Sequence, residues 1–145
     1  MTPAEFGAAR EALRRDLVID IVTLGRRSGE WRTTEIWFTR VDGAIYICGT
    51  PAAGHRERER VPRDWLANLA ANPDFEFVFK ESASVSLPAR ATVITDPGER
   101  REVYSHPSTA WYLEQAGSVE SLVENAPLVR VEFTGDAAAL NGTAR

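Results

Sequence analysis

The sequence has few of the residues from which proteins build disulfides and metal sites. It contains one cysteine, Cys48, so no disulfide can close within the chain, and a reducing compartment fits this composition. The two histidines, His55 and His106, are far apart and do not form the closely spaced ligand pairs of a zinc site. We therefore expect a cytoplasmic protein without a metal ion.

Long apolar runs and the familiar catalytic motifs are missing as well. No apolar stretch reaches the roughly 18 residues that a membrane span requires, and no signal-peptide pattern opens the chain, so we expect no integral membrane segment. The chain has neither a P-loop for a nucleoside triphosphate nor a G-x-S-x-G turn for a serine nucleophile. If the protein is an enzyme, a bound cofactor is the expected source of its chemistry.

Lysine is almost absent, because Lys80 is the one lysine among 17 basic residues and the rest are arginines. Acidic residues number 21, which gives a net charge of −4 and a pI near 5.3. A surface with this charge does not attract nucleic acid. With 145 residues, 43% of them hydrophobic, the chain has the size and composition of one globular domain.

Sequence patterns predict six strands and several short helices. Thr2-Pro3-Ala4-Glu5 is typical of a helix start, and we expect a helix over residues 3–15. We expect the first strand to be buried on both faces, and we expect Pro88 to mark a sheet edge or a bulge. The predicted strands cover residues 17–24, 33–41, 44–49, 75–80, 85–95 and 128–134, and the other helices cover residues 62–72, 96–106, 108–116 and a short segment after Ser118.

Most of these strands are joined by hairpins or short connections. Many antiparallel strands are accommodated more economically in a barrel than in an open sheet. We therefore predict an α+β, mainly β, fold: a six-stranded antiparallel barrel, closed or split, with short flanking helices. This domain is expected over residues 1–134, and the segment 135–145, rich in Ala and Gly, is expected to be a flexible tail.

The turn after the first strand carries the most chemistry. It reads GRRSGEWRTT from Gly25 to Thr34, and its two glycines permit a tight turn. Three guanidinium groups (Arg26, Arg27 and Arg32), the Ser28 hydroxyl and the turn amides are donors of the kind that hold a phosphate. The alternative is a solvated hairpin turn whose arginines bind nothing.

A second loop is expected to reach the same end of the barrel. Asp42-Gly43 predicts a two-residue hairpin turn that pairs Val41 with Ala44, so the third strand ends beside the start of the second. The loop that follows carries His55, Arg56, Arg58 and Arg60, alternating with Glu57 and Glu59. It either adds to an anion site or neutralises its own charge in solvent.

The helix predicted over residues 62–72 carries Trp65 and, one turn later, Asn68. An indole with an amide at its rim can stack on a flat heterocycle and form a hydrogen bond with it. The same pair also fits a core tryptophan with a capping amide, and the spacing alone leaves both interpretations open.

Two motifs together resemble the deazaflavin-dependent nitroreductase family, whose members are split β-barrel oxidoreductases that use coenzyme F420. They are G-R-R-S-G-x-x-R-T-T after a strand and, beyond the D-G hairpin, W-x-x-N-L-x-x-N-P before a strand. The resemblance covers roughly residues 18–80 and weakens toward residue 134. It implies a cofactor site that includes Arg26, Arg27, Ser28, Gly29, Trp31, Arg32, Thr33, Thr34, Thr50, Ala53, Gly54, Arg56, Arg63, Trp65 and Asn68.

Within this resemblance Arg27, Ser28 and Arg32 would hold the cofactor phosphate. Trp31, Thr33 and Thr34 would line its side chain or ring, and Trp65 and Asn68 would border the ring. The polyglutamate tail would suit Arg56, Arg58 or Arg60.

The chain also departs from the family pattern. Relatives have a serine-lysine-glycine-glycine run after the third strand, whereas this chain reads Thr50-Pro51-Ala52-Ala53-Gly54. Arg56 or Arg63 would have to replace the missing lysine. Relatives also place several tyrosines around a Pro-Ser pair, and here only Tyr112 remains.

The resemblance implies an oxidoreductase that transfers a hydride from reduced coenzyme F420 to a quinone, an enone or a nitro compound. Tyr112 or His106 could relay the proton, or solvent could supply it. A homodimer is expected by analogy with other split barrels. Two alternatives remain open: an oxidoreductase of the same fold that binds FMN, and a non-enzymatic binder of a phosphorylated ligand.

Overall fold

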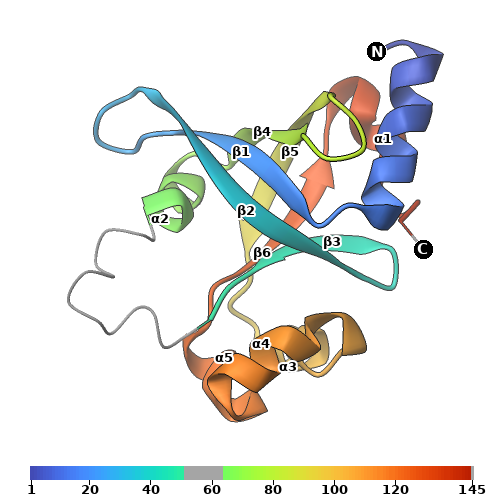
Figure 1. The fold of residues 1–145 in the computed structure, drawn as a ribbon. Coiled ribbons are helices and arrows are strands. Elements are labelled where there is room, and N and C mark those ends of the chain that lie inside the picture. Colours follow the sequence, from blue (N-terminus) through green and yellow to red (C-terminus); the bar gives the residue numbers. More distant parts are fainter. Residues whose placement is uncertain (51–63, 145) are drawn as a thin grey trace.

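The computed structural model describes residues 1–50 and 64–144, and six strands in this part form a closed barrel (Figure 1). Neighbouring strands are antiparallel, in the order β1-β2-β3-β6-β5-β4, and β1 pairs with β4 to close the barrel. The strands are β1 (Val18–Leu24), β2 (Trp31–Val41), β3 (Ala44–Cys48), β4 (Asp74–Phe79), β5 (Ser86–Val93) and β6 (Leu128–Phe133). This confirms the predicted antiparallel barrel.

Short helices surround the barrel. α1 (Pro3–Arg15) begins with the predicted capping box, in which Thr2 and Glu5 each accept a hydrogen bond from the other's backbone N–H. Figure 1 shows α1 at one end of the barrel, α2 beside the turn between β1 and β2, and three further helices below β3. The remaining helices are α2 (Asp64–Ala71), α3 (Pro97–Tyr104), η3 (Pro107–Thr109), α4 (Ala110–Ala116), α5 (Val119–Asn125) and η4 (Gly135–Leu140).

The hairpin between β2 and β3 forms as the sequence predicts. Asp42 and Gly43 both have positive φ, 52° and 89°, as a type I′ turn requires. Val41 pairs with Ala44, and Phe38 pairs with Ile47. The hairpin therefore fixes the register of β2 against β3, and β3 runs back toward the end of the barrel from which β2 starts.

The barrel interior is filled by alternate residues of the strands. Phe75, Phe77 and Phe79 of β4 are all buried, and Phe77 lies within 5.3 Å, centroid to centroid, of Phe38, Phe79 and Phe133 in edge-on contacts. The expectation for the first strand is wrong. β1 buries only alternate residues, because its other face lies on the outside of the barrel and is only partly covered.

The expectation that Pro88 marks an edge strand is also wrong, because β5 is paired on both sides, with β4 and with β6. Pro88 lies opposite Glu76 in β4, and its carbonyl accepts a hydrogen bond from Thr134, just beyond the end of β6. In a strand, the nitrogen and the carbonyl oxygen of one residue point toward the same neighbouring strand. The Pro88 nitrogen therefore points to the β6 side, as its carbonyl does. It lies beyond Phe133, where β6 has ended and the sheet needs no N–H donor.

The segment after β6 is packed, which corrects the expectation of a flexible tail. It forms η4, with Ala137 and Leu140 buried in the core. The Asn141 side chain forms two hydrogen bonds with the Phe133 backbone, and Ala144 pairs with Gly43. The small residues that suggested disorder allow this segment to lie close against the barrel.

Candidate functional site

The arginine turn, residues 25–30, is closed by its own backbone. The Gly25 N–H donates to the Glu30 carbonyl (2.8 Å), and the Gly29 N–H donates to the Gly25 carbonyl (3.0 Å). Gly29 has a φ of +69°, which favours glycine. A Cβ at residue 25 would lie 2.4 Å from Ser28 Oγ, so this position also requires glycine for the Ser28 hydroxyl to keep its place.

The Ser28 hydroxyl is held inside this turn. Its oxygen accepts a hydrogen bond from the Glu30 N–H (3.1 Å), and a hydroxyl that accepts in this way still has its own proton to donate. Within the described residues, the backbone N–H groups of Arg27 and Ser28 donate to no other group. The turn therefore presents a hydroxyl and two amides as donors.

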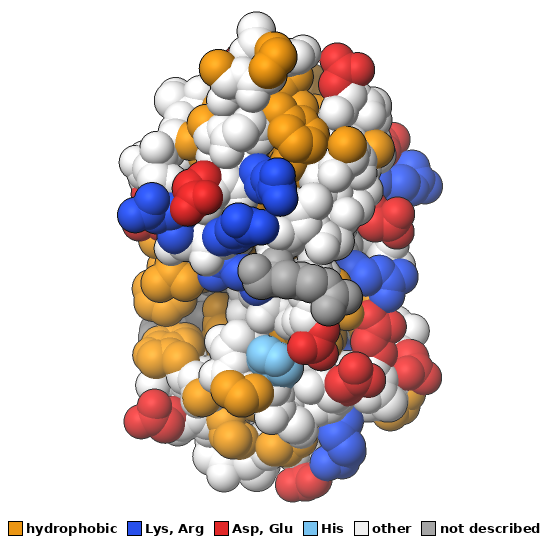
Figure 2. Space-filling view, turned by 90° about the vertical axis from the view of Figure 1, so that its right-hand side faces the viewer, with side chains coloured by type: hydrophobic (Ala, Val, Ile, Leu, Met, Phe, Trp, Pro, Cys, Tyr) orange, Lys and Arg blue, Asp and Glu red, His pale blue; other side chains and the backbone are white. Residues whose placement is uncertain are grey.

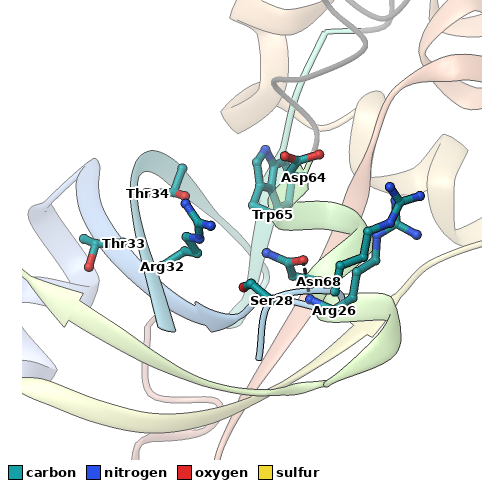
Figure 3. Close-up of a pocket in the computed structure, with 10 residues that line it drawn as sticks. Arg26, Ser28, Arg32, Thr33, Thr34, Asp64, Trp65 and Asn68 are labelled. Atoms are coloured by element: carbon teal, nitrogen blue, oxygen red, sulfur yellow. Dashed lines mark hydrogen bonds between the residues drawn. The ribbon is translucent and has the colours of Figure 1, made fainter. Parts of the chain in front are cut away.

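A groove of about 340 Å³ runs from this turn to α2. Figure 3 shows Arg32 and Thr34 on the β2 side, Trp65 on α2 across from them, and Ser28 between Arg32 and Arg26. Its lining residues are Gly25, Arg26, Arg27, Ser28, Arg32, Thr33, Thr34, Asp64, Trp65 and Asn68. The turn and the helix, distant in sequence, therefore form one concave surface.

Helix α2 contributes two buried side chains to the groove. Trp65 is 8% exposed and packs in the core cluster, so the groove is lined only by what remains accessible of its indole. Asn68 is 7% exposed, and both ends of its amide are engaged. Its Oδ1 accepts from the Arg26 N–H (3.0 Å; Figure 3). Its Nδ2 donates to Thr23 Oγ1 (3.4 Å).

The three arginines of the groove carry uncompensated charge. Arg26, Arg27 and Arg32 are exposed, and none of them forms an ion pair with an acidic residue in the described part of the chain. Asp64 lines the same groove without pairing with them. In a protein with a net charge of −4, this is a local concentration of positive charge whose donors suit an anion.

The structure brings eight of the expected cofactor residues together and leaves others aside. Gly29 shapes the turn without lining the groove, and Trp31, 60% exposed at the start of β2, lies outside the lining, as does Thr50. The expected residues Ala53, Gly54, Arg56 and Arg63 lie outside the described residues, as do Arg58 and Arg60.

Sequence reasoning did not assign Asp64 to the site. This residue opens α2 one position before Trp65, and it lines the groove. A sequence signal was available, because Asp64 directly precedes Trp65 and both residues lie in the first turn of α2.

The two expected proton donors are not brought to the groove. His106 lies 3.7 Å from Asp42 of the β2–β3 hairpin, at the opposite end of β2 from the arginine turn, roughly 30 Å along an 11-residue strand. Figure 2 shows a histidine side chain, in pale blue, with acidic side chains, in red, beside it. Tyr112 is buried among the α3–α5 helices, where burial, and secondarily Cys48, raises the pKa of its hydroxyl.

Other kinds of site were also sought. In residues 1–50 and 64–144, no three His, Cys, Asp or Glu side chains gather as metal ligands would. Across the same residues, no helix is both long and apolar enough to cross a bilayer.

Comparison with protein families gives one match. A family model described as F420H(2)-dependent quinone reductase matches residues 7–121, which include the arginine turn, β2, β3, α2 and the α3–α4 helices. A search of curated proteins finds no significant match.

Solved structures with the same fold are numerous. A conserved hypothetical protein from Mycobacterium tuberculosis is 16% identical with a TM-score of 0.61, over 93% of this chain and 82% of that one. A putative pyridoxamine 5′-phosphate oxidase from Listeria innocua is 8% identical with a TM-score of 0.58, over 90% and 94%. An F420-H2 dependent reductase is 17% identical with a TM-score of 0.51, over 81% and 95%. At these identities the likeness shows the shared fold.

Proposed function

Because the chain belongs to the F420H(2)-dependent quinone reductase family, we propose that the groove between the arginine turn and α2 is its binding site for coenzyme F420. Family membership makes the protein an oxidoreductase with coenzyme F420 as its cofactor, which confirms the activity and the cofactor that the motifs predict. The observation that carries the assignment of the site is the set of unpaired arginines at one end of the groove.

The phosphate of the cofactor fits the arginine turn. Arg32, Arg27 and the Ser28 hydroxyl supply donors from side chains, and the Arg27 and Ser28 amides supply donors from the backbone. Guanidinium groups form charge-assisted hydrogen bonds, and these are the strongest hydrogen bonds that the arginine turn can make with a phosphate. This chemistry accounts for three arginines that no acidic side chain of residues 1–50 and 64–144 neutralises.

The flat ring of the cofactor suits the other end of the groove. The accessible part of Trp65 offers an aromatic surface, and Thr34 lies across from it on β2, whereas the Thr33 side chain points away (Figure 3). Asp64 adds a carboxylate that can accept a hydrogen bond from a hydroxyl or a ring N–H. Asn68 does not need to contact the ring, because its amide already bonds with the arginine turn and β1.

When bound, the reduced cofactor supplies a hydride to an electron-poor acceptor. The work of this chain is to bind and orient: the arginine turn anchors the phosphate end, and α2 and β2 fix the plane of the ring. The groove is bordered by exposed residues from Arg26 to Thr33, so water reaches it. We assign the proton to solvent, because His106 and Tyr112 do not line the groove.

A quinone is the first acceptor to test, and an enone or a nitro compound comes next. The purified protein is titrated with coenzyme F420 and, separately, with FMN, and binding is followed by fluorescence polarisation. We expect tight binding of F420 and oxidation of reduced F420 when menadione, a simple quinone, is added. Tight FMN binding with no response to F420 would overturn the proposal, and F420 binding without turnover of any acceptor would favour a non-enzymatic binder.

We further propose that a second copy of the chain covers the outer face of β1 and β2. Trp37 is 46% exposed on this face and lies against Trp111 of α4, itself 47% exposed, with ring centroids 5.5 Å apart and ring planes tilted by 51°. Between the two ends of this face, Lys80 forms ion pairs with Asp20 and Glu35. Both signs of charge therefore lie on this face, as a self-complementary twofold contact requires.

The oligomeric state tests this surface. Light scattering after size exclusion should give a dimer for the wild type and a monomer for Trp37→Asp. Arg90→Ala, a change on β5, should remain a dimer. A wild type that is monomeric at micromolar concentration would contradict the proposal.

A further inference from the structure

One buried amide connects the two halves of the groove. Asn68 is in α2, one helical turn after Trp65, so the two side chains share a face of the helix. Its Oδ1 accepts from the backbone N–H of Arg26, and its Nδ2 donates to Thr23 Oγ1. Thr23 is fully buried near the end of β1, and Arg26 lies in the arginine turn, so the Asn68 amide contacts both the end of β1 and the turn.

In the described residues, the Arg26–Asn68 bond is the polar link between α2 and the arginine turn, and the Asn68–Thr23 bond links α2 to the end of β1. The Arg26 N–H has no other acceptor there, and a buried amide left without partners is costly, so the pairing is strongly favoured. The turn itself is exposed and is otherwise held by bonds within its own residues. Its position relative to α2 therefore depends on Asn68.

We propose that Asn68 is a positioning residue that fixes the distance between the phosphate end of the groove and the wall formed by Trp65. This inference rests on the proposed F420 site and changes one assignment within it. Asn68 acts on the cofactor through the arginine turn and not by contact with the ring. The same face of α2 then carries Trp65, which forms the wall for the ring, and Asn68, which holds the arginine turn in place.

The proposal predicts different effects on the binding of two ligands that share the deazaflavin ring. Coenzyme F420 carries the phosphate, whereas its riboflavin-type fragment has the same deazaflavin ring and no phosphate. A residue that contacts the ring affects both ligands. A residue that positions the arginine turn affects only the ligand that has the phosphate.

The test variant is Asn68→Leu, which keeps the number and branching of the side-chain heavy atoms and removes both hydrogen bonds. We expect the dissociation constant for F420 to rise about tenfold and that for the phosphate-free fragment to stay within about twofold. In turnover, KM for reduced F420 should rise while kcat at saturation changes little. The amide of Arg26, slow to exchange its hydrogen in the wild type without ligand, should exchange faster in the variant.

A milder variant covers the case in which Asn68→Leu does not fold. Thr23→Val removes only the bond at Nδ2, and we expect a smaller loss of F420 affinity, about threefold, again with the fragment unaffected. Thr23→Ser, which keeps the hydroxyl, is the matched control and should bind both ligands as the wild type does.

The outcomes are distinct. Equal weakening of both ligands in Asn68→Leu or Thr23→Val would place Asn68 against the ring and overturn the inference, and so would unchanged F420 affinity. A wild type that does not bind F420 would contradict the proposed function itself. In that case, unchanged exchange of the Arg26 amide in Asn68→Leu would still decide against a positioning role for Asn68.

Discussion

The buried arginine of α3 and the three arginines of the groove have opposite surroundings. Arg100 of α3 is buried, and its guanidinium donates to the carbonyls of Val123 (2.6 Å), Ile94 (2.8 Å) and Leu122 (3.1 Å) and to that of Ala126. In the arginine turn, Arg26, Arg27 and Arg32 are exposed and have no acidic partner in the described residues.

The comparison shows how an arginine's role is decided. Arg40 donates to the carbonyls of Leu13 and Asp16, and Arg130 pairs with Glu99 at 2.7 Å. These side chains, like Arg100, have their donors used within the fold and stabilise it. We expect the groove arginines to use their donors for a ligand, and therefore to contribute affinity and not stability.

The largest effect should come from removing the buried arginine. Arg100→Met keeps much of the aliphatic stem but deprives four carbonyls of their donor. We expect the free energy of unfolding to fall by about 3 kcal/mol, as measured by urea denaturation. The affinity of the folded protein for F420 should stay within about twofold. A loss below about 0.5 kcal/mol would show that Arg100 is not a structural residue.

Removing a groove arginine should have the reverse effect, a loss of F420 affinity with little change in stability. Arg32→Ala should weaken F420 binding by about 1.5–3 kcal/mol, because one charge-assisted contact with the phosphate is lost. Stability should change by less than about 0.5 kcal/mol. Arg90→Ala is the matched control: Arg90 is exposed and ion-paired with Asp74, so its loss should leave cofactor affinity unchanged. Equal affinities for Arg32→Ala and the wild type would remove Arg32 from the site.

A rise in pH should have the smallest of the three effects: it should lower the stability of the fold and leave the affinity of the groove for F420 nearly unchanged. Burial raises the pKa of Cys48 and of Tyr46 to about 12, and Tyr46 also donates a hydrogen bond to Glu99. The folded state therefore keeps protons that the unfolded chain releases from about pH 9 upward. Stability should be full below pH 9 and should fall as the pH rises toward 12.

Urea denaturation at pH 8, 10 and 11 checks this dependence. Tyr46→Phe should flatten part of the decline, because the substituted residue does not titrate. F420 affinity should barely change from pH 7 to 9, since guanidinium groups stay charged. Stability that rises between pH 9 and 11 would contradict the assignment of these buried groups.

Local signals in the sequence were enough to predict most of the barrel. The Asp42-Gly43 turn, the Thr2 capping box and the alternating phenylalanines of β4 each depend on neighbours within a few residues, and each is confirmed. Pro88 and the segment after β6 were misjudged. Their environments are set by Thr134, Phe133 and other residues that the chain brings together only when the barrel closes.

The same limit applies to the groove. The composition of the arginine turn and its approach to Trp65 followed from the motif and the strand order. The two bonds of Asn68 could not be predicted, because they depend on how α2 packs against the end of β1. Trp31 and Arg32 are adjacent in sequence, yet only Arg32 lines the groove, and the strand pattern alone did not decide this.

The most direct test of the account is a crystal structure of the protein with coenzyme F420. We predict that the cofactor phosphate lies within about 3.5 Å of the Arg32 guanidinium and the Ser28 hydroxyl, with the ring against Trp65. A phosphate bound elsewhere, with Arg26, Arg27 and Arg32 all in contact only with solvent, would contradict the central claim.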